Sequence, residues 1–266
     1  MAEFSHHEPC PSCGSRDNVG VWEDGGKYCF GCGWGVRGYK GISNKELKQQ
    51  LKREEKNSDG TRVASLPSDF DYGLPAVPLA WLRKYGITDQ EIAQQRMGWS
   101  DARQLLVFPV FDNYGALCFC QSRYFGANES HPKYLTSGSS EKIFNIMDRQ
   151  GRHYVSGVSD GFLNTLVLVE DHISAIRVSR SFPAMPLYGS EISTYRLRVI
   201  SDRVTRLVIW LDRDKLKNAV KARYKALAYF NQVSVVVADK DPKEYNDDDI
   251  RRIVRRSEAT DCGFSR

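Results

Sequence analysis

Four continuous apolar runs lie in the C-terminal part of the chain. They are NTLVLVE at 164–170, AMPLYGS at 184–190, RLVIWLD at 206–212 and VSVVVAD at 233–239. Strands that are buried on both faces have this pattern, because helices cover both faces of a parallel sheet. The pattern therefore predicts an α/β fold with a parallel sheet over residues 156–266.

The region before it, 66–155, has a different pattern. QLLVFPVF at 104–111 and ALCFCQSRYF at 116–125 flank the turn sequence DNYG, and this arrangement predicts a β-hairpin. Alternation along the second strand places Cys118 and Cys120 on one face. We expect both to be core thiols, because a buried cysteine behaves as a small apolar side chain.

Two short helices are expected before this hairpin. LAWLRKYGI at 79–87 has the spacing of an amphipathic helix. Thr88 and Glu91 then form a capping-box pattern that opens a second helix. Together with the hairpin, these helices predict an α+β subdomain.

A charged stretch divides the chain near its N-terminal end. Residues 48–62 contain almost no apolar side chains and mix both signs of charge, so they cannot form a core. We therefore predict an N-terminal module at 1–41, a linker at 42–65, and the two regions described above.

Four cysteines form two CxxC pairs, Cys10 with Cys13 and Cys29 with Cys32. The spacing C-x2-C-x15-C-x2-C is typical of a zinc ribbon, in which four thiolates surround Zn²⁺ at about 2.3 Å. Four protein ligands leave no open coordination position, so we expect a structural zinc ion. It would contribute on the order of 10 kcal/mol to folding of the module. A redox motif would need a βαβ context, and none surrounds these cysteines.

Aromatic and basic residues accompany the cysteines. Trp22, Lys27 and Tyr28 lie between the two pairs, and Trp34 follows them. Such side chains can stack on unpaired bases and contact phosphates. They can equally cover the small apolar face of a ribbon, and the sequence leaves both interpretations open.

Three of the four apolar runs end in an acid: Glu170, Asp212 and Asp239. Ligands of open α/β sheets bind beyond the carboxyl ends of the strands. Carboxylates gathered there repel one another, and a divalent cation removes that conflict. We therefore predict a Mg²⁺ site at Glu170, Asp212 and Asp214, with Asp241 as a further candidate. The alternative interpretation is that these acids cap helices.

Basic groups complete the candidate chemistry. In the sequence HPKYLTSGSS, Lys133, Thr136, Ser137 and Gly138 are residue types that can hold phosphate oxygens. The formal net charge is +5, and the excess lies in residues 151–266, which contain 20 Lys and Arg against 15 Asp and Glu. A positive surface attracts polyanions, although ordinary solubility explains this charge equally well.

With these residues in view, the chain resembles the DnaG-type primases, and in particular the primase half of phage primase–helicases. PKYLTSG at 132–138 is similar to the PKYLNS signature of the bacterial enzymes. LVLVEDHISAIR at 166–177 resembles the Toprim glutamate motif, and VIWLDRDKLKNA at 208–219 the DxD motif. DKDPKEY at 239–245 lies where the family has a further acid. The resemblance covers nearly the whole chain.

The resemblance implies a fold, an activity and a set of site residues. It implies a Toprim-type parallel sheet, an α+β basic subdomain and an N-terminal zinc ribbon that reads DNA. It implies a DNA primase that makes short RNA primers from ribonucleoside triphosphates on single-stranded DNA during phage replication. By position, Glu170, Asp212, Asp214 and Lys133 would be catalytic, with Mg²⁺ or Mn²⁺ as cofactor. Arg123, Lys133 and Asp241 would bind nucleotide.

The chain also departs from the family pattern. Many relatives have Gly directly after the Toprim glutamate and Asp four residues after it, where this chain has Asp171 and Ser174. Gly26 and Lys27 replace a histidine that precedes the third cysteine in some phage relatives, so the DNA sequence that is read is expected to differ. The chain contains no GxxxxGK[ST] phosphate loop. We therefore expect a separate replicative helicase, and a DNA polymerase, as partners.

Rival functions share some of these features. A Toprim nuclease or topoisomerase would use the same acids but would not need PKYLTSG. A recombination mediator can also combine zinc with a Toprim fold, usually without a complete set of acids. A non-catalytic zinc-ribbon DNA-binding protein would leave the C-terminal acids unexplained. The chain has no run of 18 or more apolar residues and no secretory signal. We therefore expect no membrane contact and a cytoplasmic location, in the bacterial host if the gene is a phage gene.

Overall fold

The computed structural model of the 266-residue chain describes residues 3–23, 25–36, 64–112, 114–140, 143–148, 153–154 and 163–261. The chain divides into two compact units, Met1–Gly60 and Thr61–Arg266. Most of the predicted linker, 42–65, lies outside the described residues, as does Cys262. No helix in the described ranges is long and apolar enough to cross a membrane.

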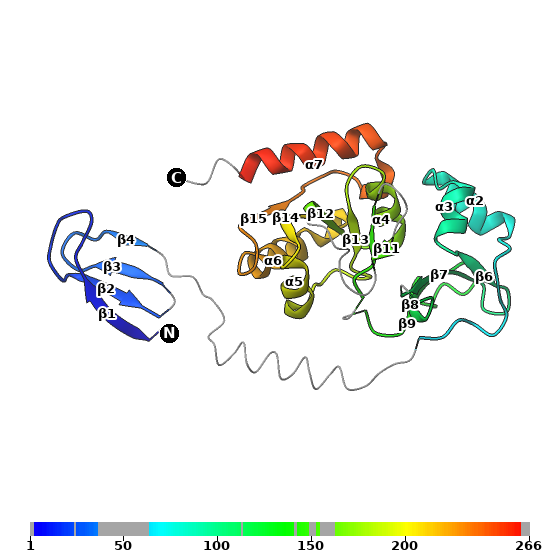
Figure 1. Cartoon of the computed structure of the whole chain (residues 1–266), viewed down its shortest axis with the longest axis horizontal. Coiled ribbons are helices and arrows are strands. Elements are labelled where there is room, and N and C mark those ends of the chain that lie inside the picture. The colour runs from blue at the N-terminus through cyan, green and yellow to red at the C-terminus, as the bar shows by residue number, and fades with distance from the viewer. Residues whose placement is uncertain are drawn as a thin grey trace. The chain divides into compact units, whose positions relative to one another are not determined.

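The first unit is a small antiparallel sheet, drawn in blue in Figure 1. Its strands pair in the order β1-β2-β3-β4: β1 (Phe4–Glu8), β2 (Val19–Trp22), β3 (Lys27–Cys29) and β4 (Gly35–Val36). Its core consists of Cys10, Val19, Val21 and Cys29, with Trp34 packed against them. So few apolar groups cannot stabilise a module of this size, so another source of folding energy is required.

The second unit begins with a five-stranded antiparallel sheet in the order β5-β6-β7-β8-β9. These strands are β5 (Phe70–Asp71), β6 (Gly98–Ser100), β7 (Leu105–Phe111), β8 (Leu117–Tyr124) and β9 (Tyr134–Ser137). The predicted hairpin is confirmed as β7 and β8, with Leu105 opposite Tyr124. Cys120 is buried as predicted, whereas Cys118 is only partly buried.

Helices α2 (Ala76–Lys84) and α3 (Asp89–Gln94) accompany this sheet. Helix α2 begins before the predicted 79–87, directly after Pro75. It also ends earlier than predicted, because Gly86 adopts a left-handed conformation (φ 67°) that terminates it. The capping box is confirmed: the Thr88 backbone N–H donates to Glu91 Oε2 at 2.8 Å, and the Glu91 N–H donates to Thr88 Oγ1 at 3.2 Å.

A six-stranded sheet follows, in the order β11-β10-β13-β12-β14-β15. Its strands are β10 (Ile146–Met147), β11 (His153–Tyr154), β12 (Leu163–Val169), β13 (Ala184–Pro186), β14 (Val204–Ile209) and β15 (Gln232–Val235). The last four pair in parallel, which confirms the sheet predicted from the four apolar runs. Strands β10 and β11 add an antiparallel edge. The sheet therefore starts before residue 156, where the predicted division placed it.

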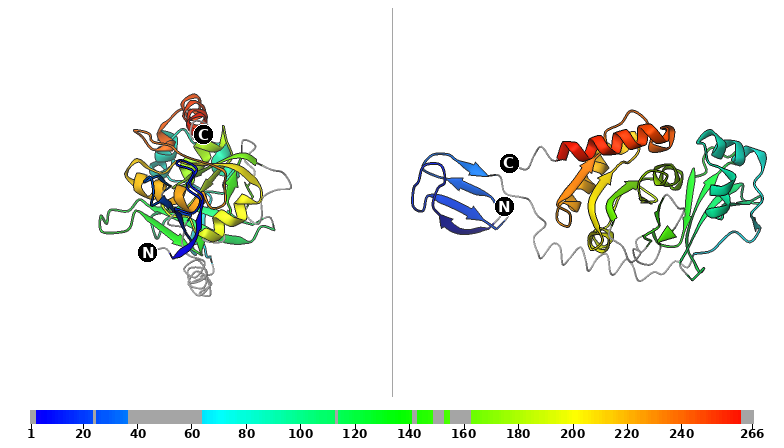
Figure 2. Two further views of the ribbon diagram at one scale, coloured as in Figure 1. Left: turned by 90° about the vertical axis from the view of Figure 1, so that its left-hand side faces the viewer. Right: turned by 45° about the horizontal axis from the view of Figure 1, so that its top comes forward.

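Helices cover both faces of this sheet (Figures 1 and 2). They are α4 (His172–Ser179), α5 (Thr194–Ser201), α6 (Leu216–Ala226) and α7 (Asp247–Asp261), and two short 3₁₀ helices, η2 (Arg213–Lys215) and η3 (Pro242–Glu244), follow β14 and β15. Alternate residues of β12 face opposite sides: Val167 contacts the α4 and α7 side, and Leu168 the α5 and α6 side. This double burial is why the strands are continuous apolar runs.

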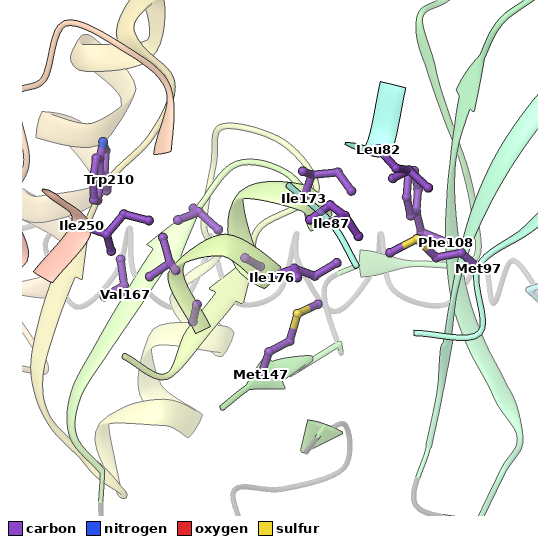
Figure 3. Packing of buried hydrophobic residues seen from close by; sticks show 14 of the residues in the cluster. Leu82, Ile87, Met97, Phe108, Met147, Val167, Ile173, Ile176, Trp210 and Ile250 are labelled. Carbon is purple, nitrogen blue, oxygen red and sulfur yellow. The ribbon is translucent and has the colours of Figure 1, made fainter. Parts of the chain in front are cut away.

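One apolar cluster joins the two sheets of the second unit (Figure 3). It extends from the antiparallel part through Leu82, Ile87, Met97 and Phe108 to Ile173 and Ile176 of α4, and on to Val167, Trp210 and Ile250. Leu82 and Phe108 are fully buried. The predicted subdomains at 66–155 and 156–266 therefore share one core and hold each other in a fixed geometry.

Candidate active site and metal centre

The four N-terminal cysteines converge on one point. Their Sγ atoms all lie within 4.8 Å of one another. The Cys10 and Cys32 sulfurs are 3.7 Å apart, and those of Cys13 and Cys29 are 3.8 Å apart. A tetrahedron with metal–sulfur bonds of about 2.3 Å has sulfur–sulfur edges of about 3.8 Å. The cluster therefore fits a tetrahedral zinc ion with four thiolate ligands.

Two similar turns place these ligands. The Gly14 N–H donates to the Cys10 carbonyl at 3.0 Å, and the Gly33 N–H donates to the Cys29 carbonyl at 3.0 Å. Both glycines have positive φ, 70° and 75°. That conformation is unfavourable for residues with a Cβ, so the sequences CPSCG and CFGCG specify the ligand turns as well as the ligands.

Aromatic side chains gather on the same module. Phe4, Tyr28 and Phe30 are 53%, 46% and 65% exposed. The rings of Tyr28 and Phe30 are 5.4 Å apart, and Trp22 lies 6.2 Å from Phe4 and 6.4 Å from Phe30. Trp34, in contrast, packs against the module's core. The ribbon therefore has an aromatic face formed by Phe4, Trp22, Tyr28 and Phe30, two of which, Phe4 and Phe30, the sequence analysis did not single out.

The predicted acids of the second unit lie at the carboxyl end of the parallel sheet. Glu170 follows β12 and Asp212 lies three residues after the end of β14. Strands β12 and β14 are neighbours in the sheet. The chain passes from β12 to β13 on one side of this pair and from β14 to β15 on the other side. A reversal of this kind opens a crevice at the strand ends. Glu170, Asp212 and Asp241 all line a pocket of about 240 Å³ there.

Two further charged residues line the same pocket, Asp171 and Lys243. The Lys243 Nζ lies 2.6 Å from Asp171 Oδ2, 3.2 Å from Asp241 Oδ2 and 3.5 Å from Asp212 Oδ2. Sequence reasoning passed over Lys243 within DKDPKEY and left the role of Asp171 open. A lysine two residues after an acid gives no signal that it will turn toward acids on other strands.

Burial and like charges change the protonation of the acids. Burial, with the neighbouring carboxylates of Asp171, Asp241 and Glu170, raises the pKa of Asp212 to about 7, although Lys243 opposes the rise. Burial likewise raises the pKa of Glu170. Glu170 Oε2 and Asp212 Oδ1 are buried and have no hydrogen-bond partner. A divalent cation would supply the partner that these two buried carboxylate oxygens lack and would offset the repulsion between the acids.

Two predicted or candidate acids lie elsewhere. The side chain of Asp214, on η2, is 70% exposed and pairs with Lys215, and it does not line the pocket. Asp239 accepts a hydrogen bond from the Tyr245 hydroxyl and also lies outside the lining. Neither Glu170 nor Asp214 caps a helix; Asp171 caps α4, and its Oδ1 accepts from the Ser174 N–H at 2.8 Å.

Basic and aromatic residues from the antiparallel part also line the pocket. Arg123 is the next-to-last residue of β8 and lies opposite Tyr134 of β9, and its Nη1 donates to the Tyr134 hydroxyl at 2.9 Å. Its guanidinium also lies 4.3 Å from the centre of the Trp81 ring. Lys133, adjacent to Tyr134, lines the pocket and is exposed. These contacts fix the direction of Arg123 without neutralising it with a carboxylate.

The rest of the PKYLTSG loop has structural roles. The Ser137 hydroxyl accepts from the Ser65 N–H at 3.0 Å. Gly138 has a φ of 92°, and a Cβ there would lie 2.8 Å from the Cys118 carbonyl oxygen. Of the four residues considered for phosphate contacts, only Lys133 lines the pocket. The other residues shape the end of β9.

A buried polar network supports the site from behind. The Tyr188 hydroxyl accepts from Asn145 Nδ2 at 2.6 Å, and His172 Nε2 lies 2.9 Å from Gln95 Oε1. His172 stacks on Phe108 and follows Asp171 in the chain. Tyr188 itself lines the pocket. The network therefore connects the antiparallel part to the strand ends that carry the acids.

Solved structures with the same arrangement were found by comparison. The Aquifex aeolicus primase (zinc-binding and RNA polymerase domains) aligns over 96% of this chain and 80% of its own, with a TM-score of 0.55 and 15% identity. The E. coli primase catalytic core aligns over 69% and 72%, with a TM-score of 0.54 and 15% identity. A DnaG primase catalytic domain bound to single-stranded DNA aligns over 81% of both chains, with a TM-score of 0.55 and 15% identity.

This chain has the fold of the DnaG-type primases. The fold predicted from the sequence is thereby confirmed, with its parallel sheet, its α+β part and its cysteine module. No protein-family model and no curated protein sequence matches the chain. The special similarity to phage primase–helicases and the roles of the site residues stay predictions.

The raised pKa of Asp212 in this primase fold predicts a pH-dependent stability. A raised pKa means that the folded state binds the proton of Asp212 more tightly than the unfolded state does. Protonation of Asp212 therefore stabilises the folded protein fully below pH 4, and this contribution is lost as pH rises through about 7. Without added divalent cation, Asp212→Asn should therefore gain thermal stability relative to the wild type between pH 5 and pH 8. Unfolding temperatures across this range test the prediction.

Asp239→Asn is the matched control, because the Tyr245 hydroxyl lowers the pKa of Asp239 below its ordinary value. That carboxyl is ionised throughout the range, and its effect on unfolding should be constant. A constant difference for Asp212→Asn as well would contradict the assignment of the high pKa.

Proposed function

We propose that this protein is a DNA primase, which condenses ribonucleoside triphosphates into short RNA primers on a single-stranded DNA template. The observation that carries the proposal is one pocket, in a primase fold, that is lined both by acids at the reversal point of the sheet and by Arg123 and Lys133. Transfer from a nucleoside triphosphate needs both kinds of residue: basic side chains that bind the phosphates, and acids that hold a metal ion near the reacting phosphorus.

The residues divide the work between them. Glu170 and Asp212 would hold Mg²⁺ or Mn²⁺, which supplies Lewis-acid stabilisation of the attacking oxygen and the displaced pyrophosphate. Arg123 and Lys133 would bind the triphosphate and offset its charge as a 3′ oxygen bonds to the α-phosphorus and pyrophosphate leaves. Asp214, predicted as a third ligand, would first have to turn away from Lys215.

The cysteine module is proposed to assist initiation of the primer. Joining two free nucleotides lacks the preformed primer end that an extending polymerase uses, so a second template contact lowers the entropic cost of initiation. We propose that the ribbon binds zinc through Cys10, Cys13, Cys29 and Cys32 and holds the template through its aromatic face. Exposed rings are stacking surfaces for unpaired bases.

Substitution in the aromatic face tests this role. The double variant Tyr28→Ala/Phe30→Ala should bind single-stranded DNA at least roughly 30-fold more weakly, because each stacked base contributes about 1–3 kcal/mol and two stacking rings are removed. Fluorescence anisotropy with a labelled oligonucleotide measures this loss. Tyr114→Ala is the control, because Tyr114 is 93% exposed in the β7–β8 turn and should not matter. Equal affinity of the double variant and the wild type would remove the aromatic face from the proposal.

Primer synthesis tests the function itself. The protein is mixed with single-stranded DNA of random sequence, four ribonucleotides of which one is labelled, and Mg²⁺ or Mn²⁺. Short labelled RNAs are expected, and sequencing of productive templates gives the sequence that is read. DNA cleavage or relaxation without RNA would favour a Toprim nuclease or topoisomerase, and binding alone a non-catalytic DNA-binding protein.

We further propose that the protein works in the cytoplasm, of a bacterial host if it is a phage protein. A separate replicative helicase would open the duplex ahead of it, and a DNA polymerase would extend its primers. Affinity capture on the full chain, followed by identification of an ATP-dependent helicase that stimulates primer synthesis, tests this expectation.

A further inference from the structure

A lysine lies inside the acidic group of the pocket. The Lys243 side chain is only 10% exposed, and its Nζ contacts carboxylate oxygens from three different segments, those of Asp171, Asp212 and Asp241. Three carboxylates at ion-pair distances of 2.6–3.5 Å stabilise the charged ammonium form of this side chain. Lys243 is therefore a fixed positive charge at the centre of the group.

The surrounding chain holds Lys243 in this position. Lys243 lies in η3 directly after Pro242, and the Asp241 N–H donates to Glu244 Oε2 at 3.2 Å across this turn. Asp171, its nearest partner, caps α4 through its other oxygen. The η3 turn fixes the backbone of Lys243, and the α4 cap fixes its partner Asp171. The ammonium group therefore stays within the acidic group of the pocket.

Asp212 is shared between Lys243 and the remainder of the site. Its Oδ2 lies 3.5 Å from the Lys243 Nζ, whereas its Oδ1 is buried without a hydrogen-bond partner, as is Glu170 Oε2. In two-metal phosphoryl-transfer sites, two cations about 3.5–4 Å apart stabilise the attacking and leaving oxygens together. Here the ammonium group of Lys243 pairs with one oxygen of Asp212, and the other oxygen is left without a partner.

We propose that this site uses one divalent cation, held by Glu170 and Asp212, and that Lys243 supplies the positive charge that a second cation would otherwise provide. The inference rests on the proposed function, and it specifies the metal content of that site. It follows from charge as well as geometry, because a second divalent cation beside Asp171 and Asp241 would be repelled by the ammonium group. Lys243 is a positioning residue for Asp212 as well as a charge.

Counting bound Mn²⁺ tests the proposal without relying on activity. The zinc-loaded full chain is titrated with Mn²⁺, and free Mn²⁺ is followed by electron paramagnetic resonance. The number of ions in the pocket is the difference between the wild type and Glu170→Gln/Asp212→Asn. One ion per chain is expected for the wild type, with the spectrum of an isolated Mn²⁺.

Substitution of Lys243 should then change both the number of Mn²⁺ ions bound in the pocket and the affinity for the first of them. Lys243→Gln removes the charge and should bind the first Mn²⁺ at least roughly tenfold more tightly, since a unit charge a few ångströms away is lost. It should also accept a second ion, seen as an exchange-coupled spectrum. Lys243→Arg keeps the charge and should bind one ion. Lys240→Gln, an exposed lysine nearby, should behave as the wild type.

The outcomes separate this inference from the proposed function. Two coupled ions in the wild type, or identical binding by Lys243→Gln and the wild type, would overturn the inference and leave primer synthesis untouched. An absence of Mn²⁺ binding in the pocket would overturn both the inference and the metal-dependent mechanism. If Lys243→Gln fails to fold, the number of Mn²⁺ ions bound by the wild type and their spectrum still show whether the pocket holds one ion or two.

Discussion

Replacement of Asp212 by asparagine is expected to reduce primer synthesis at least roughly 10²-fold. Asp212 Oδ2 lies 3.5 Å from the Lys243 Nζ, and its Oδ1 is buried without a hydrogen-bond partner. Asparagine keeps the shape but removes a charge that holds the divalent cation. A bound cation contributes several kcal/mol to stabilisation of phosphoryl transfer, and about 1.4 kcal/mol corresponds to a tenfold change in rate.

Initial rates at saturating ribonucleotide and Mg²⁺ measure this effect. The affinity for template DNA should change little, because the proposed template contacts lie on the zinc module. Asp239→Asn is the control: it removes an acid at the end of a neighbouring strand that lies outside the pocket lining, and it should retain activity. Activity of Asp212→Asn within about threefold of the wild type would remove Asp212 from the catalytic group and contradict the proposed metal site.

Loss of zinc is expected to unfold the first unit and abolish primer initiation. The core of that unit contains little besides Cys10, Cys29, Val19 and Val21. A structural zinc ion contributes on the order of 10 kcal/mol to such a module, which exceeds what this core can supply. Cys29→Ser should therefore lose the metal, and the amide resonances of the ribbon should collapse to random-coil values.

The second unit should remain folded in this variant, because it has its own core. Its unfolding temperature should not change, and extension of a supplied RNA primer should persist when synthesis from free nucleotides is lost. Cys118→Ser is the matched control, because Cys118 belongs to the second unit and is not one of the four clustered cysteines, and the zinc content of this variant should equal that of the wild type. Zinc retention by Cys29→Ser, or unchanged ribbon resonances, would show that the cysteines do not stabilise the module in this way.

Several features of the fold could be predicted from sequence because each depends on a local pattern. The spacing of the cysteines fixes the ligand turns, and the glycines after each pair allow the left-handed conformations that those turns need. The apolar runs predict the parallel strands because burial on both faces leaves no polar positions. Thr88 and Glu91 form their capping box within one turn of chain.

Other features escaped prediction because they depend on segments far apart in the chain. Strands β10 and β11 are two residues long and carry no periodicity, so their pairing with the parallel sheet was not seen. Phe4 and Phe30 join Trp22 and Tyr28 only because β1, β2 and the turn after β3 lie together.

The sequence by itself determined which chemistry is present: four thiolates at ribbon spacing, and acids placed after buried strands. Only the tertiary structure decided how the acids are balanced. Asp171 and Lys243 are 72 residues apart, yet their charged atoms are 2.6 Å apart. Electrostatic energy depends on distance in space and on burial, and neither quantity is written in the order of residues. The position of one lysine among three carboxylates is therefore a property of the fold, and with it the number of cations that the site is proposed to hold.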